Sequence, residues 1–163
     1  MHVRAAEPDD SAAILSVHEA AIAERGPLAY DDAVVDAWHA GRSVDDYTFD
    51  GEDTFLVAET NAGTVVGFGI ALPECRDHLV ADVDGEVTAL YVDPNRAGEG
   101  VGTLLLDALH GSLREQDVAS AACWASANAA SFYERRGYER VTTHRHEFGD
   151  GVTGDVVELW TSL

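Results

Sequence analysis

Lysine is absent from the 163-residue sequence, and ten arginines stand against thirty aspartates and glutamates, which gives a formal net charge of −20. With so few cations no basic patch can be assembled, and this disfavours nucleic-acid binding through the phosphates. The acids are scattered along the whole chain, so they form no acidic tail, and one acidic cleft would not need thirty of them. Adaptation to multimolar salt explains the pattern, because at about 1 M salt the Debye length of roughly 3 Å screens the self-repulsion. The composition therefore predicts an extreme halophile as the source.

Cysteines and long apolar runs are also scarce. Cys75 and Cys123 are the only cysteines, and two unpaired thiols are typical of a cytoplasmic protein. No stretch approaches the roughly 20 apolar residues of a transmembrane helix, and residues 1–4 lack the pattern that begins a signal peptide. We therefore expect a cytoplasmic protein with no membrane partner. The length, with 46% hydrophobic residues, suits one domain over residues 1–163.

Helical and strand periods alternate along the sequence. The first helix, which follows Pro8, has an apolar face made of Ile14, Val17, His18, Ala21 and Ile22. A later helix over residues 101–116 is predicted to direct Val101, Leu104, Leu105, Ala108, Leu109 and Leu113 inward. The other predicted helices are residues 30–40 and 128–137, and the predicted strands are residues 2–7, 54–60, 64–72, 86–92 and 118–124 and two strands that flank Gly149-Asp150-Gly151. The order β-α-α-β-β-β-α-β-α-β-β predicts one mixed α/β (α+β) domain.

A glycine-rich turn joins the strand over residues 86–92 to the helix over residues 101–116. Gly98, Gly100 and Gly102 alternate with other residues there, so the backbone can adopt positive φ and approach a ligand closely. Backbone N–H groups and the helix N-terminus then converge on one point, which suits a pyrophosphate. A tight strand-to-helix connection is the alternative. A P-loop is excluded because no lysine precedes Thr103, and the G-x-G-x-G spacing differs from the dinucleotide fingerprint.

A second motif, Asn128-Ala-Ala-Ser-Phe-Tyr-Glu-Arg-Arg-Gly137-Tyr, follows about thirty residues later. Asn128 is predicted to cap a short helix at its N-terminus, and Gly137 is predicted to end that helix in the left-handed region. Phe132 and Tyr133 either pack in the core or line a site. For Phe132 we expect packing.

The two motifs together resemble those of the GCN5-related N-acetyltransferase (GNAT) superfamily. Gly100 and Gly102 match the small positions of its Arg/Gln-x-x-Gly-x-Gly/Ala loop, whereas Ala97 and Glu99 replace residues that are often basic. The resemblance covers nearly the whole chain and is specific over residues 86–138. It implies a central mixed, mostly antiparallel sheet that is flanked by helices, with acetyl-CoA as cosubstrate. Because Ala97 and Glu99 remove positive charge, backbone N–H groups are expected to carry most of the phosphate binding.

The resemblance also implies roles for single residues. Tyr133 takes the position of the general acid that protonates the departing thiolate, and Glu86 or a water takes the proton of the acceptor amine. The acceptor is expected near Glu86, His18, Tyr30 and His78. The cofactor is expected to contact Leu90, Tyr91, Val92, Arg96, Ala97, Gly98, Glu99, Gly100, Val101, Gly102, Thr103, Asn128, Ser131 and Tyr133.

The reaction implied is direct transfer of an acetyl group from acetyl-CoA to a primary amine on a small molecule or a peptide. A catalytically weak sensor of acyl-CoA is one alternative, because of Ala97 and Glu99, and an interaction protein without a CoA site is another. No metal is expected, since Cys75 and His78 have no second ligand pair nearby. Family dimers often form through the last strands, so the resemblance leaves a homodimer open.

Overall fold

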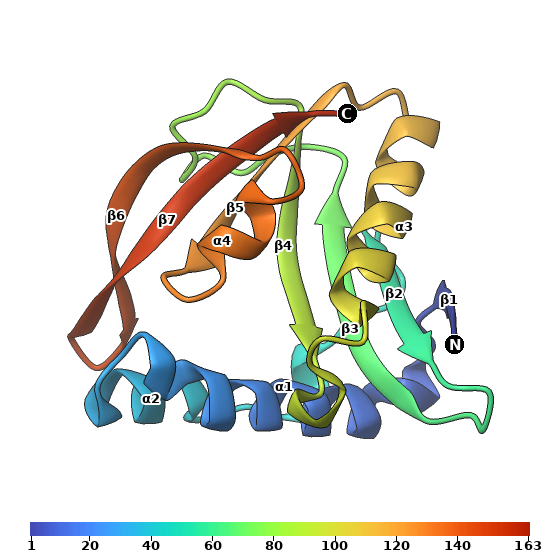
Figure 1. The fold of residues 1–163 in the computed structure, drawn as a ribbon, viewed down its shortest axis with the longest axis horizontal. Coiled ribbons are helices and arrows are strands. Elements are labelled where there is room, and N and C mark those ends of the chain that lie inside the picture. Colours follow the sequence, from blue (N-terminus) through green and yellow to red (C-terminus); the bar gives the residue numbers. More distant parts are fainter.

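The computed structural model describes residues 1–163 (Figure 1). The strands are β1 His2–Ala5, β2 Thr54–Glu59, β3 Val65–Leu72, β4 Gly85–Val92, β5 Ser120–Ser126, β6 Glu139–Gly149 and β7 Val152–Ser162. The α-helices are α1 Ser11–Arg25, α2 Asp32–His39, α3 Val101–Glu115 and α4 Ala130–Glu134. This order confirms the predicted sequence of elements and the mixed α/β class. No helix combines the length and apolarity needed to span a bilayer.

The seven strands form one sheet in the order β1-β2-β3-β4-β5-β7-β6. Every neighbouring pair is antiparallel except β4 and β5, which run parallel. These two strands pair only where Gly85 faces Ala121 and Glu86 faces Ala122. Beyond these pairs they diverge, and Figure 1 shows β5 leaning away from β4. The divergence exposes one backbone edge of β4 and one of β5 at the centre of the sheet.

Helices cover both faces of the sheet. On one face α1 packs against β3 and β4, with Ile14 and Val17 against Phe55, Val57 and Phe68. On the other face α3 lies over β2, β3 and β4, and its Val101 and Leu105 join a core cluster with Ala58 and Val66. The main core lies beside α3, between α4, β5 and β7.

The buried faces of the long helices test the predicted periodicity. In α1 the buried residues are those predicted: Ile14, Val17, His18, Ala21 and Ile22. In α3 the prediction holds for Val101, Leu105, Leu109 and Leu113, whereas Ala108 is only half-buried; it is wrong for Leu104, which is exposed, and it missed Leu106 and His110. The reason is that α3 is covered by the sheet and also by the β5–α4 region, so its buried stripe is rotated toward Leu106, which packs in the main core.

A β-bulge interrupts β4 just after its last pair with β5. Ile70 of β3 faces Ala89, and the next residue, Ala71, faces Val87, so Thr88 is the extra residue. A bulge of one residue reverses the alternation of side chains on either side of it. Glu86 and Leu90 would share a face of a regular strand, but here Glu86 reaches Arg76 and His78 while Leu90 packs toward α3.

Candidate active site

The glycine-rich turn leaves β4 at Val92 and enters α3 at Val101. After a short 3-10 helix, Pro94–Arg96, Gly98 and Gly100 adopt φ angles of +81° and +83°. A Cβ at either position would meet no atom within 4 Å, so the backbone conformation, not lack of space, requires glycine there. Left-handed glycines in this turn are what the sequence predicts.

The start of α3 presents backbone N–H groups that have no partner in the helix. Leu104 is the first residue there whose N–H bonds back, to the carbonyl of Gly100 at 3.0 Å. The N–H groups of Val101, Gly102 and Thr103 are therefore left at the positive end of the helix dipole. A phosphate at this position would accept hydrogen bonds from them.

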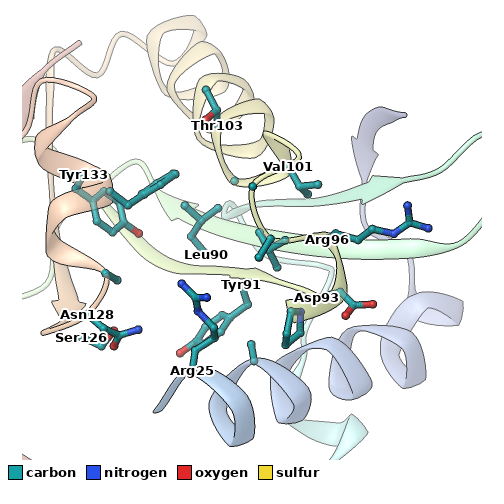
Figure 2. Close-up of a pocket in the computed structure, with 18 of the residues that line it drawn as sticks. Arg25, Leu90, Tyr91, Asp93, Arg96, Val101, Thr103, Ser126, Asn128 and Tyr133 are labelled. Atoms are coloured by element: carbon teal, nitrogen blue, oxygen red, sulfur yellow. The ribbon is translucent and has the colours of Figure 1, made fainter. Parts of the chain in front are cut away.

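A cavity of about 490 Å³ opens in front of this turn, between β4, α3, α4 and the end of α1 (Figure 2). We call it the anion cavity. Of the residues predicted to bind the cofactor, only Glu99 is outside its lining, because Glu99 is exposed and faces Arg96 at 3.4 Å. The lining includes Leu90, Tyr91, Val92, Arg96, Ala97, Gly98, Gly100, Val101, Gly102, Thr103, Asn128, Ser131 and Tyr133.

Four of the ten arginines line the anion cavity, against a single carboxylate, Asp93. Arg25 comes from the end of α1, Arg96 from the turn, and Arg135 and Arg136 from the segment after α4. In a chain with a net charge of −20 this local excess of positive charge suits an anionic ligand. Sequence reasoning expected help only from Arg96, and it missed the other three because they are distant from the turn in the chain.

Two buried polar atoms of the anion cavity have no hydrogen-bond partner, Oδ1 of Asn128 and Nε of Arg136. The sequence predicted that Asn128 caps α4, and this prediction is wrong, because the helix begins after Ala129 and no side chain caps it. The guanidinium of Arg136 lies over the ring of Phe132 at 3.9 Å. A buried polar group without a partner costs about 1–3 kcal/mol. Both atoms therefore favour a polar ligand in this cavity.

A second, smaller cavity of about 180 Å³ lies between the α2 region, β4, β5 and β6. We call it the aromatic cavity, because nearly half of its lining residues carry rings: Tyr30, Trp38, Tyr91, Trp124, Tyr133, His146 and Phe148. Tyr30 was predicted near the acceptor, and its hydroxyl donates to the carbonyl of Asp155 at 2.7 Å and accepts from the N–H of Ala127 at 3.2 Å. These two bonds fix the ring of Tyr30 against β7 and the residue that follows β5.

Tyr133 belongs to the lining of both cavities. Its side chain extends from α4 toward Leu90 of β4, as Figure 2 shows, and Leu90 also borders both cavities. The residue is 7% exposed. Burial raises the pKa of the Tyr133 phenol well above its ordinary value of 10.0, so the hydroxyl keeps its proton at any physiological pH.

Trp124 of the aromatic cavity is held by a buried carboxylate, Glu158 of β7. The indole Nε1 donates to Glu158 at 3.0 Å, His144 lies 2.9 Å from the same carboxylate oxygen, and the N–H groups of Val80 and Ala81 donate to Glu158 at 2.8–3.0 Å. Burial alone would raise the pKa of Glu158, but these hydrogen bonds outweigh it and lower that pKa. The carboxylate thus ties the loop of residues 73–84 and Trp124 to β7.

Glu86, which was predicted to act as a base, is 1% exposed and lines neither cavity. Arg76 binds its two oxygens at 2.7 and 3.0 Å, and Nε2 of His78 lies 3.0 Å from it. His78 in turn packs edge-on against Trp124, with 4.5 Å between the ring centroids. Glu86 and His78 therefore stand behind the wall of the aromatic cavity, and this geometry gives Glu86 no direct contact with an acceptor.

His18, also predicted near the acceptor, is part of the core beneath the site. Its ring lies 4.1 Å from that of Tyr91, and its Nδ1 lies 2.9 Å from the hydroxyl of Tyr47. Burial first, and then the nearby charges of Arg42 and His39, lower the pKa of His18 to about 3. The structure does not bring this uncharged imidazole to either cavity.

A family model described as the acetyltransferase (GNAT) domain matches residues 51–140. This chain belongs to the GNAT acetyltransferase family. The matched segment includes β4, the glycine-rich turn, α3 and α4, so it contains the anion cavity's main walls. The GNAT fold expected from the two motifs is thereby confirmed.

Known GNAT proteins resemble the chain over different lengths. A mycothiol acetyltransferase of Propionibacterium freudenreichii is 35% identical over 145 residues, which are 83% of this chain and 42% of that protein, so the chain spans about two fifths of this curated relative. A GCN5-related N-acetyltransferase of Rhodopseudomonas palustris, also described as "Aminotransferase, Class-II", is 26% identical with a TM-score of 0.82 over 99% of this chain and 94% of that one. The yncA protein of Salmonella typhimurium, solved with its cofactor acetyl-CoA, is 22% identical with a TM-score of 0.72 over 99% and 93%.

Several residues of this GNAT site that sequence reasoning missed come from β5 and β6. His144 and His146 alternate on β6, and alternation places side chains on one face of a strand. The structure puts both rings against Trp124, at centroid distances of 4.5 and 5.7 Å, and it brings Phe148, the next residue in that alternation, against His146 at 4.8 Å. The alternation was visible in the sequence, but the packing of these rings against Trp124 of β5 was not.

Proposed function

We propose that the chain is an N-acetyltransferase that transfers the acetyl group of acetyl-CoA to a primary amine. The observation that carries this proposal is that Tyr133 borders both the anion cavity and the aromatic cavity. A cosubstrate thiol in the first cavity and an acceptor in the second would meet at its hydroxyl. The GNAT relative of Salmonella typhimurium, solved with acetyl-CoA, supports the choice of donor.

The residues of the anion cavity fit coenzyme A. The N–H groups at the start of α3 and the four lining arginines suit its phosphates. The unpaired Oδ1 of Asn128 suits an amide N–H of the pantetheine arm. The edge of β4 beyond its last pair with β5 leaves backbone groups near Leu90 and Val92 for the same arm.

The bound cosubstrate supplies an activated acetyl thioester. In the transfer, the bond from the amine nitrogen to the acetyl carbon forms, the carbon–sulfur bond breaks, the nitrogen loses a proton and the sulfur gains one. Tyr133 is placed to give the proton to sulfur, because its pKa is raised by burial and its hydroxyl is protonated when the sulfur leaves. A phenol in this position also excludes water from the junction of the two cavities.

In this proposal Glu86 accepts the amine proton indirectly, through a water, because it does not reach the acceptor. His78 bonds to Glu86 and packs against Trp124 of the aromatic cavity, so a water beside His78 is the link through which the buried carboxylate would act. In this form of the proposal Glu86 and His78 position the water, and neither touches the acceptor.

Titration calorimetry with acetyl-CoA and a thiol-release assay over a panel of amines test the proposal, both in molar KCl to suit a chain of net charge −20. We expect acetyl-CoA to bind and at least one amine to be acetylated. Binding without transfer to any amine would instead support an acyl-CoA sensor, an alternative that is favoured by the differences from the GNAT loop pattern at Ala97 and Glu99. No binding at any salt concentration would refute both functions.

A further inference from the structure

The aromatic cavity contains no carboxylate, although thirty of the chain's residues are acidic. Its members other than hydrophobic side chains are Thr88, Ser126 and His146. Burial, together with the nearby imidazole of His78, lowers the pKa of His146 although Glu147 opposes this, so the ring is uncharged at neutral pH. The wall of the cavity therefore carries no formal charge, and this sets it apart from the acidic surface around it.

The rings of the cavity form a continuous wall. Trp124 lies 5.7 Å from His146, and His146 lies 4.8 Å from Phe148. Phe148 then reaches Trp38 and Tyr30 at 5.6 and 5.3 Å. These are ordinary distances for tilted and edge-to-face ring pairs, so each ring is held by its neighbours and the cavity is pre-formed.

A glycine fixes the packing of two of these rings. A Cβ at Gly154 of β7 would lie 3.1 Å from the ring of Phe148 and 3.3 Å from that of Tyr30. Any larger residue there would displace both rings from these positions. The glycine thus lets Phe148 and Tyr30 pack closely against β7.

The volume limits the size of the ligand group. About 180 Å³ is below the roughly 300–1,000 Å³ of sites for drug-sized molecules. It is close to the engineered cavity of about 150 Å³ that binds benzene. One ring-sized or branched aliphatic group fills it, with a short arm to carry the amine to Tyr133.

Charge limits the chemistry of that group. An ammonium or guanidinium buried without a carboxylate loses its hydration and gains no ion pair. Aromatic faces also attract cations, so a cage for a permanent cation is the competing interpretation. Against it, the wall also contains aliphatic residues such as Val87, Leu90 and Val156, which offer a cation no such attraction.

We propose that the acceptor is a small primary amine whose neighbouring group is uncharged, apolar and no larger than a single ring, and that this group occupies the aromatic cavity. This inference rests on the proposed acetyl transfer. It disfavours polyamines, lysine side chains and amines that carry a second charged group.

The test compares amines of matched shape in the thiol-release assay. Phenethylamine and neohexylamine present an apolar group two carbons from the nitrogen. Aminoethyltrimethylammonium has the shape of neohexylamine with a permanent positive charge. With rates referred to the concentration of neutral amine, we expect kcat/KM to be at least about tenfold higher for neohexylamine than for its cationic isostere. Phenethylamine should exceed an Nα-blocked lysine amide by a similar factor.

A pair of variants ties the preference to the cavity. Phe148→Ala removes one ring of the wall, and the energy of an aromatic pair corresponds to a loss of about threefold to tenfold in kcat/KM for phenethylamine, with the KM for acetyl-CoA unchanged. Phe49→Ala is the control, because Phe49 stacks on Phe55 away from both cavities. It should leave both constants as they are.

Faster acetylation of the cationic isostere or of the lysine amide would overturn the apolar acceptor while acetyl transfer stands. An equal loss in Phe148→Ala and Phe49→Ala would also overturn it, because the cavity would then have no part in acceptor choice. Failure of every amine, together with failure of acetyl-CoA to bind, would instead refute the proposed function.

Discussion

Replacing Tyr133 by phenylalanine removes one hydroxyl at the junction of the two cavities. The ring is 7% exposed and packs against Phe132 and Tyr138 at 5.2 Å each, so phenylalanine keeps these contacts. No hydrogen-bond partner would be orphaned, because the hydroxyl faces the cavities. We therefore expect the free energy of unfolding to change by less than about 0.5 kcal/mol.

The effect on turnover follows from the loss of a general acid, which contributes about 10²–10⁴-fold. We expect kcat of Tyr133→Phe to fall by at least about a hundredfold, with the Kd of acetyl-CoA within about twofold of the wild-type value. Because the pKa of Tyr133 is raised well above 10.0, the wild-type rate should not decline through its deprotonation up to about that pH. Thiol release at saturating acetyl-CoA and calorimetry measure the two quantities.

Tyr138→Phe is the matched control. Tyr138 is buried beyond the end of α4, bonds to Nε2 of His110 at 2.8 Å and lines neither cavity. Its variant should lose about 1 kcal/mol of stability, the typical net value of a hydrogen bond, without loss of kcat. Unchanged turnover in Tyr133→Phe, or equal losses in the two variants, would refute the role assigned to Tyr133.

Three further predictions concern other parts of the molecule. Arg25→Ala should raise the Kd of acetyl-CoA by about threefold to tenfold at low KCl and by less in molar KCl. The reason is that the exposed guanidinium lines the anion cavity and salt screens its charge. A rise in Kd that calorimetry finds to be independent of salt would contradict this. Gly102→Ala would place a Cβ 3.2 Å from the ring of Phe132, and we expect about 1 kcal/mol of destabilisation with a raised KM for acetyl-CoA, measured by thermal melts and initial rates. His18 has a pKa lowered to about 3, so between pH 6.5 and 3 the unfolded chain binds a proton that the folded chain does not. The free energy of unfolding therefore decreases as the pH is lowered through this range, by up to about 1.4 kcal/mol per pH unit. His18→Phe should flatten that slope in denaturant unfolding between pH 6.5 and 4, and an unaltered slope would show that other groups cause it.

The sequence predicted the local features of the fold well. The order of elements and the buried face of α1 depend on periodicity within one segment, and both agree with the structure. The positive φ angles of Gly98 and Gly100 likewise follow from a glycine pattern within a few residues. The GNAT resemblance placed all but one of the predicted cofactor residues in the lining of the anion cavity for the same reason, since those residues lie in two continuous motifs, but it did not include Arg25 at the end of α1.

What the sequence could not predict depends on contacts between distant segments. The aromatic cavity joins Tyr30 and Trp38 with Trp124 and with Phe148 from three distant parts of the chain, and no local pattern links these three parts. The bulge at Thr88 turned Glu86 away from the face that simple alternation gives it. Leu104 fits the helical period as well as Leu106 does, so only the neighbours of α3 decide which of the two is buried.

The short pairing between β4 and β5 has a consequence for how firmly the two halves of the molecule are joined. Only two residue pairs connect strands β1–β4 with strands β5–β7 across the sheet, so this seam is the weakest line of backbone hydrogen bonding in the molecule. Local opening concentrates where such bonds are few. A ligand that lies in the seam and bridges both edges stabilises the closed form in proportion to RT ln(1 + [L]/Kd). Coenzyme A would then hold the two parts of the sheet together, and amide hydrogen exchange along β4 and β5 would slow in its presence.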